Sequence, residues 1–110
     1  MRIIITGRSN SGKSTAMSFL QKDQSAIEVS PDKILANYSE EDIIILIDTP
    51  ALFCYKRSGC IENDIDYLNR IKKEDFLLDF VKELPDCHIL KNDQSTDVLK
   101  VRLKRLIKSL

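Results

Sequence analysis

The sequence predicts an α/β fold in which a small, mostly parallel sheet of about four strands is covered by helices on both faces. Short apolar segments alternate with segments of helical periodicity along the 110 residues, a pattern typical of parallel sheets. The segment of residues 43–47 is apolar at every position, as expected for a strand buried on both faces. The length suits one domain covering residues 1–110.

The first half of the chain is expected to contain two strands and two helices. The first strand covers residues 2–6, and the first helix begins at Lys13 and ends near residue 22. A short strand at residues 26–29 precedes a second helix that ends near Tyr38. Ser30 can cap this helix, and a proline follows at the first helical position.

The second half is expected to add two strands and three helices. After the strand at residues 43–47, a short helix covers residues 51–56 and a long helix runs from residue 63 or 64 to Leu84. The last strand covers residues 87–90, and Ser95 caps a final amphipathic helix. The apolar positions that keep a rough helical period in the long helix are Ile65, Leu68, Ile71, Phe76, Phe80 and Leu84.

The most specific motif lies between the first strand and the first helix. Its pattern of Gly, four residues, Gly, Lys and Ser predicts a phosphate-binding loop, and therefore the P-loop NTPase fold. Backbone N–H groups of such a loop surround phosphate oxygens, while the lysine reaches the outer phosphates and the serine hydroxyl holds Mg²⁺. We therefore expect bound ATP and Mg²⁺. The expected nucleotide contacts are Gly7, Arg8, Ser9, Asn10, Ser11, Gly12, Lys13, Ser14 and Thr15.

Three further side chains are candidates for phosphate chemistry, besides Lys13. Asp48 ends the apolar strand, where it could organise Mg²⁺ together with Ser14 or instead cap the next helix. Asp32 could accept a proton from a substrate hydroxyl or complement a helix dipole. Arg57 could close over a transferring phosphate or lie in a solvated loop.

Other polar residues have weaker assignments. Glu28 is a lesser candidate for the role of Asp32. Arg8 points either to solvent or to the phosphate of a substrate. The residues from Asn92 to Ser95 follow the last strand, where the loop of this fold class passes beside the nucleotide base.

The composition limits the expected partners. Acidic and basic residues balance at 17 each, so no net field favours nucleic acid or an anionic membrane. The apolar segments are too short to span a bilayer, and three irregularly spaced cysteines fit free thiols in a reducing cytoplasm. Neither nucleic acid nor membrane is an expected partner. A small sheet can leave an edge or helix face uncovered, so a homo-oligomer stays open.

These motifs, in this order, resemble a much shortened P-loop nucleoside or nucleotide kinase, with thymidylate kinase and the deoxynucleoside kinases in particular. The resemblance rests on residues 1–20 with their loop, and on the order of elements in residues 43–110. It implies that Lys56 and Arg57 begin a lid over the phosphates. It also implies that Asn92 and Gln94 contact adenine.

The expected function is transfer of the γ-phosphate of ATP to a nucleoside, a nucleotide or another small hydroxyl acceptor. One alternative is a catalytically inactive nucleotide-binding or regulatory protein. Another is a GTPase-like switch, because Asp48-Thr49-Pro50 resembles the start of an Asp-x-x-Gly motif. Ala51 stands in place of that glycine, and Lys91-Asn92-Asp93 departs from the guanine-reading order Asn-Lys-x-Asp.

Overall fold

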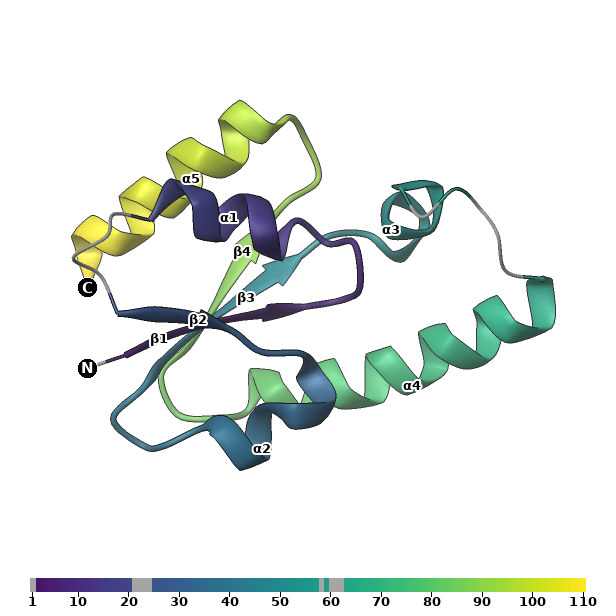
Figure 1. Ribbon diagram of the computed structural model, residues 1–110, viewed down its shortest axis with the longest axis horizontal. Coiled ribbons are helices and arrows are strands. Elements are labelled where there is room, and N and C mark those ends of the chain that lie inside the picture. The colour runs from purple at the N-terminus through teal and green to yellow at the C-terminus, as the bar shows by residue number, and fades with distance from the viewer. Residues whose placement is uncertain (1, 21–24, 58, 60–62) are drawn as a thin grey trace.

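A parallel sheet of four strands forms the centre of the protein, and helices cover both of its faces (Figure 1). The computed structural model describes residues 2–20, 25–57, 59 and 63–110. The strand order is β2-β1-β3-β4, and the predicted α/β class is confirmed. The strands are β1 (Ile3–Gly7), β2 (Ala26–Glu28), β3 (Ile43–Asp48) and β4 (Cys87–Lys91).

The helices follow the predicted order, with some different ends. The first one stops at Phe19 because Leu20 is already extended, and residues 21–22 of its predicted course lie outside the described residues. The long helix ends at residue 82 rather than 84. The helical elements are α1 (Lys13–Phe19), the 3₁₀ turn η1 (Pro31–Lys33), α2 (Ile34–Asn37), α3 (Ala51–Arg57), α4 (Asp64–Lys82) and α5 (Thr96–Ser109).

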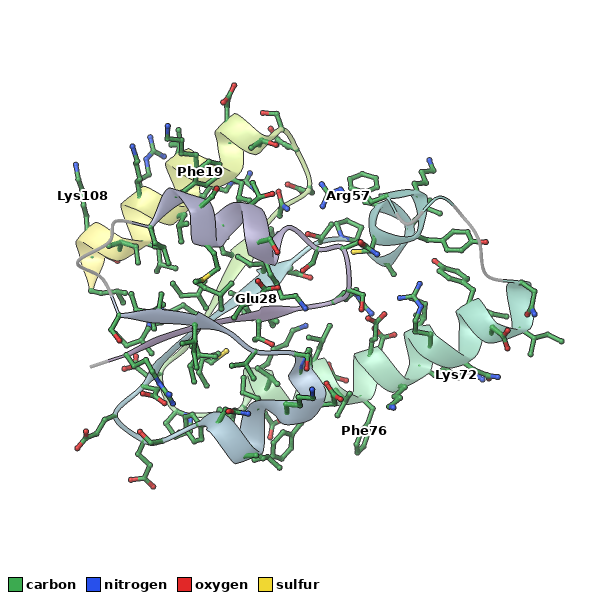
Figure 2. All side chains as sticks on the ribbon, in the orientation of Figure 1. Phe19, Glu28, Arg57, Lys72, Phe76 and Lys108 are labelled. Carbon is green, nitrogen blue, oxygen red and sulfur yellow. The ribbon has the colours of Figure 1, made fainter. Side chains whose placement is uncertain are left out.

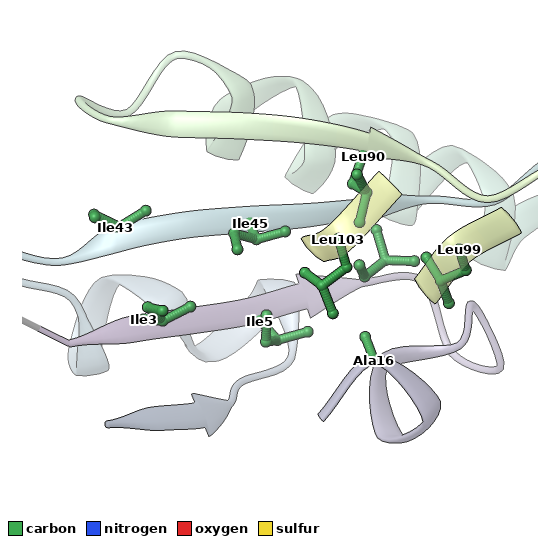
Figure 3. Close-up of a cluster of buried hydrophobic side chains, with 9 residues drawn as sticks. Ile3, Ile5, Ala16, Ile43, Ile45, Leu90, Leu99 and Leu103 are labelled. Atoms are coloured by element: carbon green, nitrogen blue, oxygen red, sulfur yellow. The ribbon is translucent and has the colours of Figure 1, made fainter. Parts of the chain in front are cut away.

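The two central strands are buried on both faces because their side chains alternate between two hydrophobic clusters. Figure 3 shows the first cluster, in which the strands meet α1 and α5. The second cluster lies on the opposite face, against α2 and α4. The first contains Ile3, Ile5, Ala16, Ile43, Ile45, Ile47, Leu90, Leu99 and Leu103, and the second contains Ile4, Val29, Ile34, Ile44 and Val81.

Most of the periodic apolar positions of α4 are exposed. The side chains of Leu78 and Val81 are buried instead, in the half of the helix that packs on the sheet. The other half extends beyond the sheet (Figure 1), so its apolar residues have no layer to pack against. Ile65 and Leu68 in this half are 72% and 57% exposed. Phe76 and Phe80 lie in the half that packs on the sheet, and they are still 74% and 45% exposed.

An ion pair holds the amino-terminal ends of β1 and β3 together. An Nη2 atom of Arg2 lies 2.7 Å from Oδ2 of Asp42, and that carboxylate also accepts a hydrogen bond from the backbone N–H of Ser39. The hydrogen bond from Arg2 is the main reason that the pKa of Asp42 is lowered. The pair thus fixes the end of the sheet opposite to the glycine loop.

Replacement of Ile45 by alanine should lower the free energy of unfolding by about 2–5 kcal/mol, because it leaves a cavity between the sheet and the α1–α5 layer. Ile45 has 0% exposure. Leu68→Ala is the matched control, since its exposed side chain should change stability by about 0.5 kcal/mol or less. Urea unfolding measures both. Equal losses for the two variants would contradict the assigned core and the exposed half of α4.

Candidate nucleotide site

The site lies where the chain changes direction across the sheet. From β1 the chain crosses to β2 on one side, whereas β3 pairs with β1 on the other side. A crevice opens at such a reversal, beyond the carboxyl ends of the strands. Gly7 ends β1 and Asp48 ends β3 at this point, and the phosphate-loop motif begins directly beside it.

The loop needs glycine at two positions. Gly7 and Gly12 have φ angles of +154° and +102°, which residues other than glycine rarely adopt. A Cβ on Gly7 would lie 2.7 Å from the carbonyl oxygen of Ile47, and one on Gly12 would lie 2.7 Å from Nδ2 of Asn92. The glycines therefore allow the loop to pass close to both β3 and the residue after β4.

The carbonyl oxygen of Ser11 anchors the middle of the loop. Thr49 Oγ1 donates a hydrogen bond to it at 2.5 Å, and Asn92 Nδ2 donates another at 2.8 Å. All three residues are buried. Because Thr49 follows β3 and Asn92 follows β4, the loop that begins at β1 is fixed to the ends of two further strands.

The other loop residues are held by α3 and α4. Arg57 donates from Nη1 to the carbonyl oxygen of Asn10 at 3.1 Å. The backbone N–H of Ser9 donates to Oε2 of Glu74 at 3.3 Å. Arg8 forms ion pairs with Glu74, at 3.5 Å, and with the neighbouring Asp75. The loop is thus preorganised by side chains from three directions.

Lys13 folds back over the loop that precedes it. Its Nζ donates to the carbonyl oxygen of Gly7 at 2.9 Å. Desolvation lowers the pKa of this amine, while the carboxylates of Glu28, Glu74 and Asp32 act in the opposite direction. A half-buried amine at this point is placed to meet the phosphates of a bound nucleotide.

A pocket of about 390 Å³ adjoins the loop. Figure 2 shows Glu28 from β2 and Arg57 from α3 at this end of the sheet. Three of the lining residues, Asn92, Thr96 and Leu99, come from the last strand–helix connection and α5. The others are Asn10, Ser11, Gly12, Lys13, Ser14, Thr15, Glu28 and Arg57.

The residues around Ser14 fit Mg²⁺. Its hydroxyl donates to Oε2 of Glu28 at 3.2 Å, so a hydroxyl and a carboxylate lie together beside the pocket. Mg²⁺ prefers hard oxygen ligands and is usually held by one or two protein groups together with substrate phosphates. Asp48 is half-buried at the end of β3 and does not line the pocket. Ser14 and Glu28 would therefore be the nearest protein ligands, with Asp48 farther back.

The remaining predicted residues divide between the pocket and its surroundings. Asp32 lines a neighbouring hollow of about 180 Å³ together with Ser9 and Lys13. A hydrogen bond from Ser30 lowers the pKa of Asp32, which makes it a weaker proton acceptor. Arg8 forms its ion pairs with Glu74 and Asp75 of α4 and does not line the pocket. Gln94 is exposed and does not line the pocket.

The sequence interpretation missed or undervalued several contacts. Thr49 enters the sequence interpretation only as the middle of the segment Asp48-Thr49-Pro50, Glu28 only as a lesser proton acceptor, and Glu74 not as a site residue. Their roles depend on which strands and helices are neighbours in space. Only the polar character of Thr49 directly after an apolar strand could have suggested a function.

The described residues show no cluster of three or more histidine, cysteine or acidic side chains suited to a metal. Cys54 and Cys87 are free thiols, and Cys60 lies outside the described residues. No helix in the described part of the chain is long and apolar enough to cross a membrane.

The glycine loop, its lysine and serine, and its place at the reversal of the sheet define a P-loop nucleotide-binding protein. The model of the 50S ribosome-binding GTPase family matches residues 2–108. The chain belongs to this family. Searches of curated proteins and of solved structures gave no match.

The family match corrects the resemblance to nucleoside and nucleotide kinases, which is wrong. The strand, phosphate loop and helix of residues 1–20 are shared by many P-loop families. The rest of that resemblance depended on the order of elements in residues 43–110, and element order alone does not identify a function. The assignments as a kinase and as a transferase have no support from the family match.

Replacement of Lys13 by alanine should weaken nucleotide binding about 10- to 100-fold, since a charge-assisted hydrogen bond contributes about 1.5–3 kcal/mol. Lys33→Ala, on an exposed lysine of η1, is the control and should bind as the unchanged protein does. Titration with a fluorescent nucleotide measures both. Unaltered affinity in Lys13→Ala would contradict the assignment of the loop.

Proposed function

We propose that the protein binds GTP with Mg²⁺ and hydrolyses it, so that its surface differs between the triphosphate and diphosphate states. The family match over residues 2–108 supports guanine rather than the adenine expected from the sequence. The observation that carries the proposal is the loop fixed through Ser11 by Thr49 and Asn92. A loop that is fixed in this way needs less reorganisation when it binds and stabilises the charge of the phosphates.

Asp93 is the proposed reader of guanine. Guanine presents N–H donors at N1 and N2, and a carboxylate can accept both, whereas adenine lacks this pair of donors. Asp93 directly follows Asn92, which lines the pocket, and Arg102 holds its carboxylate at 3.0 Å. The hydrogen bond from Arg102 lowers the pKa of Asp93, so the group remains an acceptor. Asn92 instead donates a hydrogen bond to Ser11 and holds the loop in place. This different role accounts for the departure of Lys91-Asn92-Asp93 from the order Asn-Lys-x-Asp.

The alanine in place of the motif glycine is compatible with this function. Ala51 is the first residue of α3, and N–H groups in the first turn of a helix have no acceptor within that helix. A backbone N–H is therefore available for a terminal phosphate whether the residue is glycine or alanine. Thr49, two residues earlier, connects this segment to the loop through Ser11.

Arg57 is the proposed cation for the transition state. Hydrolysis of GTP spreads negative charge over the transferring group and the leaving oxygen, and a positioned guanidinium stabilises that charge. Arg57 lines the pocket and donates to Asn10 within the phosphate loop. Lys13 would neutralise the outer phosphates in both the ground state and the transition state, while Ser14 and Glu28 would hold Mg²⁺.

The decisive experiment compares GTP and ATP binding in the unchanged protein and in Asp93→Asn. We expect a clear preference for GTP, reduced about 10-fold or more in the variant because one acceptor is lost and an N–H₂ group opposes the guanine donors. Calorimetric titration measures the affinities, with Asp97→Asn as the control at an exposed acid of α5. Equal affinity of the unchanged protein for GTP and ATP would overturn the proposal.

Arg57→Ala should lower kcat for GTP hydrolysis about 10- to 1,000-fold, while GDP affinity changes much less. Lys56→Ala is the matched control, because this neighbouring cation is exposed and does not line the pocket. Phosphate release under single-turnover conditions measures the rate. A rate loss of the same size in both variants would show that Arg57 has no special role.

A further inference from the structure

A second groove lies between α1 and α5, at the end of α1 that is farther from the phosphate loop. It has a volume of about 450 Å³ and shares no lining residue with the nucleotide pocket. Val101 in its wall is 48% exposed. Its apolar lining consists of Phe19, Leu20, Val101, Leu103 and Ile107. We call this feature the α1–α5 groove.

Three cations border the α1–α5 groove, and in the described part of the chain none of them is paired with a carboxylate. Lys104, Arg105 and Lys108 all line it. Among the described residues, no carboxylate forms an ion pair with any of them. Lys100 adds a fourth positive charge over the ring of Phe19, 5.7 Å from its centroid. A suitable occupant is therefore apolar and carries negative charge.

The chain itself has such a surface on α4. Phe76 and Phe80 are four residues apart, so they lie on one side of the helix, and they are 74% and 45% exposed. Asp79 and Glu83 each lie three residues after one of these rings, and neither forms an ion pair with a described residue. Lys72 and Lys73 lie one turn before Phe76, so the negative charge is at the carboxyl end of the patch. We call Phe76, Asp79, Phe80 and Glu83 the α4 ridge.

The ridge and the groove of one molecule cannot meet. The helices α1 and α5 cover one face of the sheet, and α4 packs on the other face. Figure 2 shows Phe19 and Lys108 on the α1–α5 side, and Phe76 on the opposite side. Contact between the two surfaces therefore requires two copies of the chain.

We infer that the protein associates head to tail, with the α4 ridge of one copy in the α1–α5 groove of the next. An amphipathic helix in an apolar groove is a common mode of recognition, with anchors at positions i and i+4. Phe76 and Phe80 are the anchors, and Asp79 and Glu83 face Lys104, Arg105 and Lys108. Because the two surfaces differ, each added copy leaves one ridge and one groove free, and the assembly grows with concentration.

Two variants separate the two halves of this interface. Phe76→Lys removes an anchor and places a positive charge against the cationic groove. Lys104→Glu combined with Lys108→Glu reverses two charges at the groove. Each variant lacks one half of the contact, so each alone should remain monomeric. An equimolar mixture pairs the intact groove of the first with the intact ridge of the second, giving a species of twice the chain mass that grows no further.

Light scattering after size exclusion, from roughly 10 µM to 1 mM, covers the range expected for a weak interface. For the unchanged protein, we expect a mass that rises with concentration and falls at high salt. Leu68→Lys is the matched control for the ridge, since it adds a lysine at an exposed apolar position of α4 about two turns before Phe76. Lys33→Glu with Lys56→Glu matches the charge change of the groove variant at two exposed lysines that belong to neither surface. Both controls should associate as the unchanged protein does.

Three results would overturn the inference. The first is an unchanged protein that stays monomeric over the whole range, which would leave the groove for a separate acidic partner. The second is a mixture of the two variants that fails to pair although each binds nucleotide normally, which shows that both are folded. The third is a closed dimer that persists in either variant alone, because a symmetric contact would not use these two surfaces.

Discussion

The carbonyl oxygen of Ser11 is the point on which the nucleotide site depends. It accepts hydrogen bonds from Thr49 and Asn92, which lie at the ends of different strands. In a buried environment such bonds are electrostatically strong, and an unpaired partner would be costly. The three strands therefore have to assemble in the right order before the loop is held in place. The nucleotide site is therefore expected to form together with the sheet.

Much of the fold followed from local patterns in the sequence. The fully apolar segment at residues 43–47 indicated a strand buried on both faces, and the glycine–lysine–serine motif indicated the loop and its neighbours. Local patterns could not predict the hydrogen bonds that Thr49 and Asn92 donate to Ser11. The same is true of the hydrogen bond between Ser14 and Glu28. They depend on strand order, for which the sequence contains no local signal. The family was also assigned wrongly, because the phosphate loop is common to proteins with different reactions.

The exposed apolar residues of α4 could not be predicted for a different physical reason. Helical periodicity shows which apolar residues share a side of a helix, but not how far the neighbouring sheet extends. The carboxyl-terminal half of α4 packs on the sheet through Val81, and its middle supplies Glu74 to the phosphate loop. Phe76 lies beside this junction and faces away from the sheet. One helix thus links the loop to a surface outside the site.

The Arg2–Asp42 pair lies at the other end of the same two strands, and it makes the ends of the sheet differ in their response to acid. Because the pKa of Asp42 is lowered in the folded protein, its contribution to stability is complete above the ordinary value of about 4. That contribution decreases as the pH falls through the lowered value. The hydrogen bonds to Ser11 come from the hydroxyl of Thr49 and the amide of Asn92, and neither group titrates in this pH range. Acid below about pH 4 would therefore weaken the amino-terminal end of the sheet, while the hydrogen bonds from Thr49 and Asn92 to Ser11 would keep their protons.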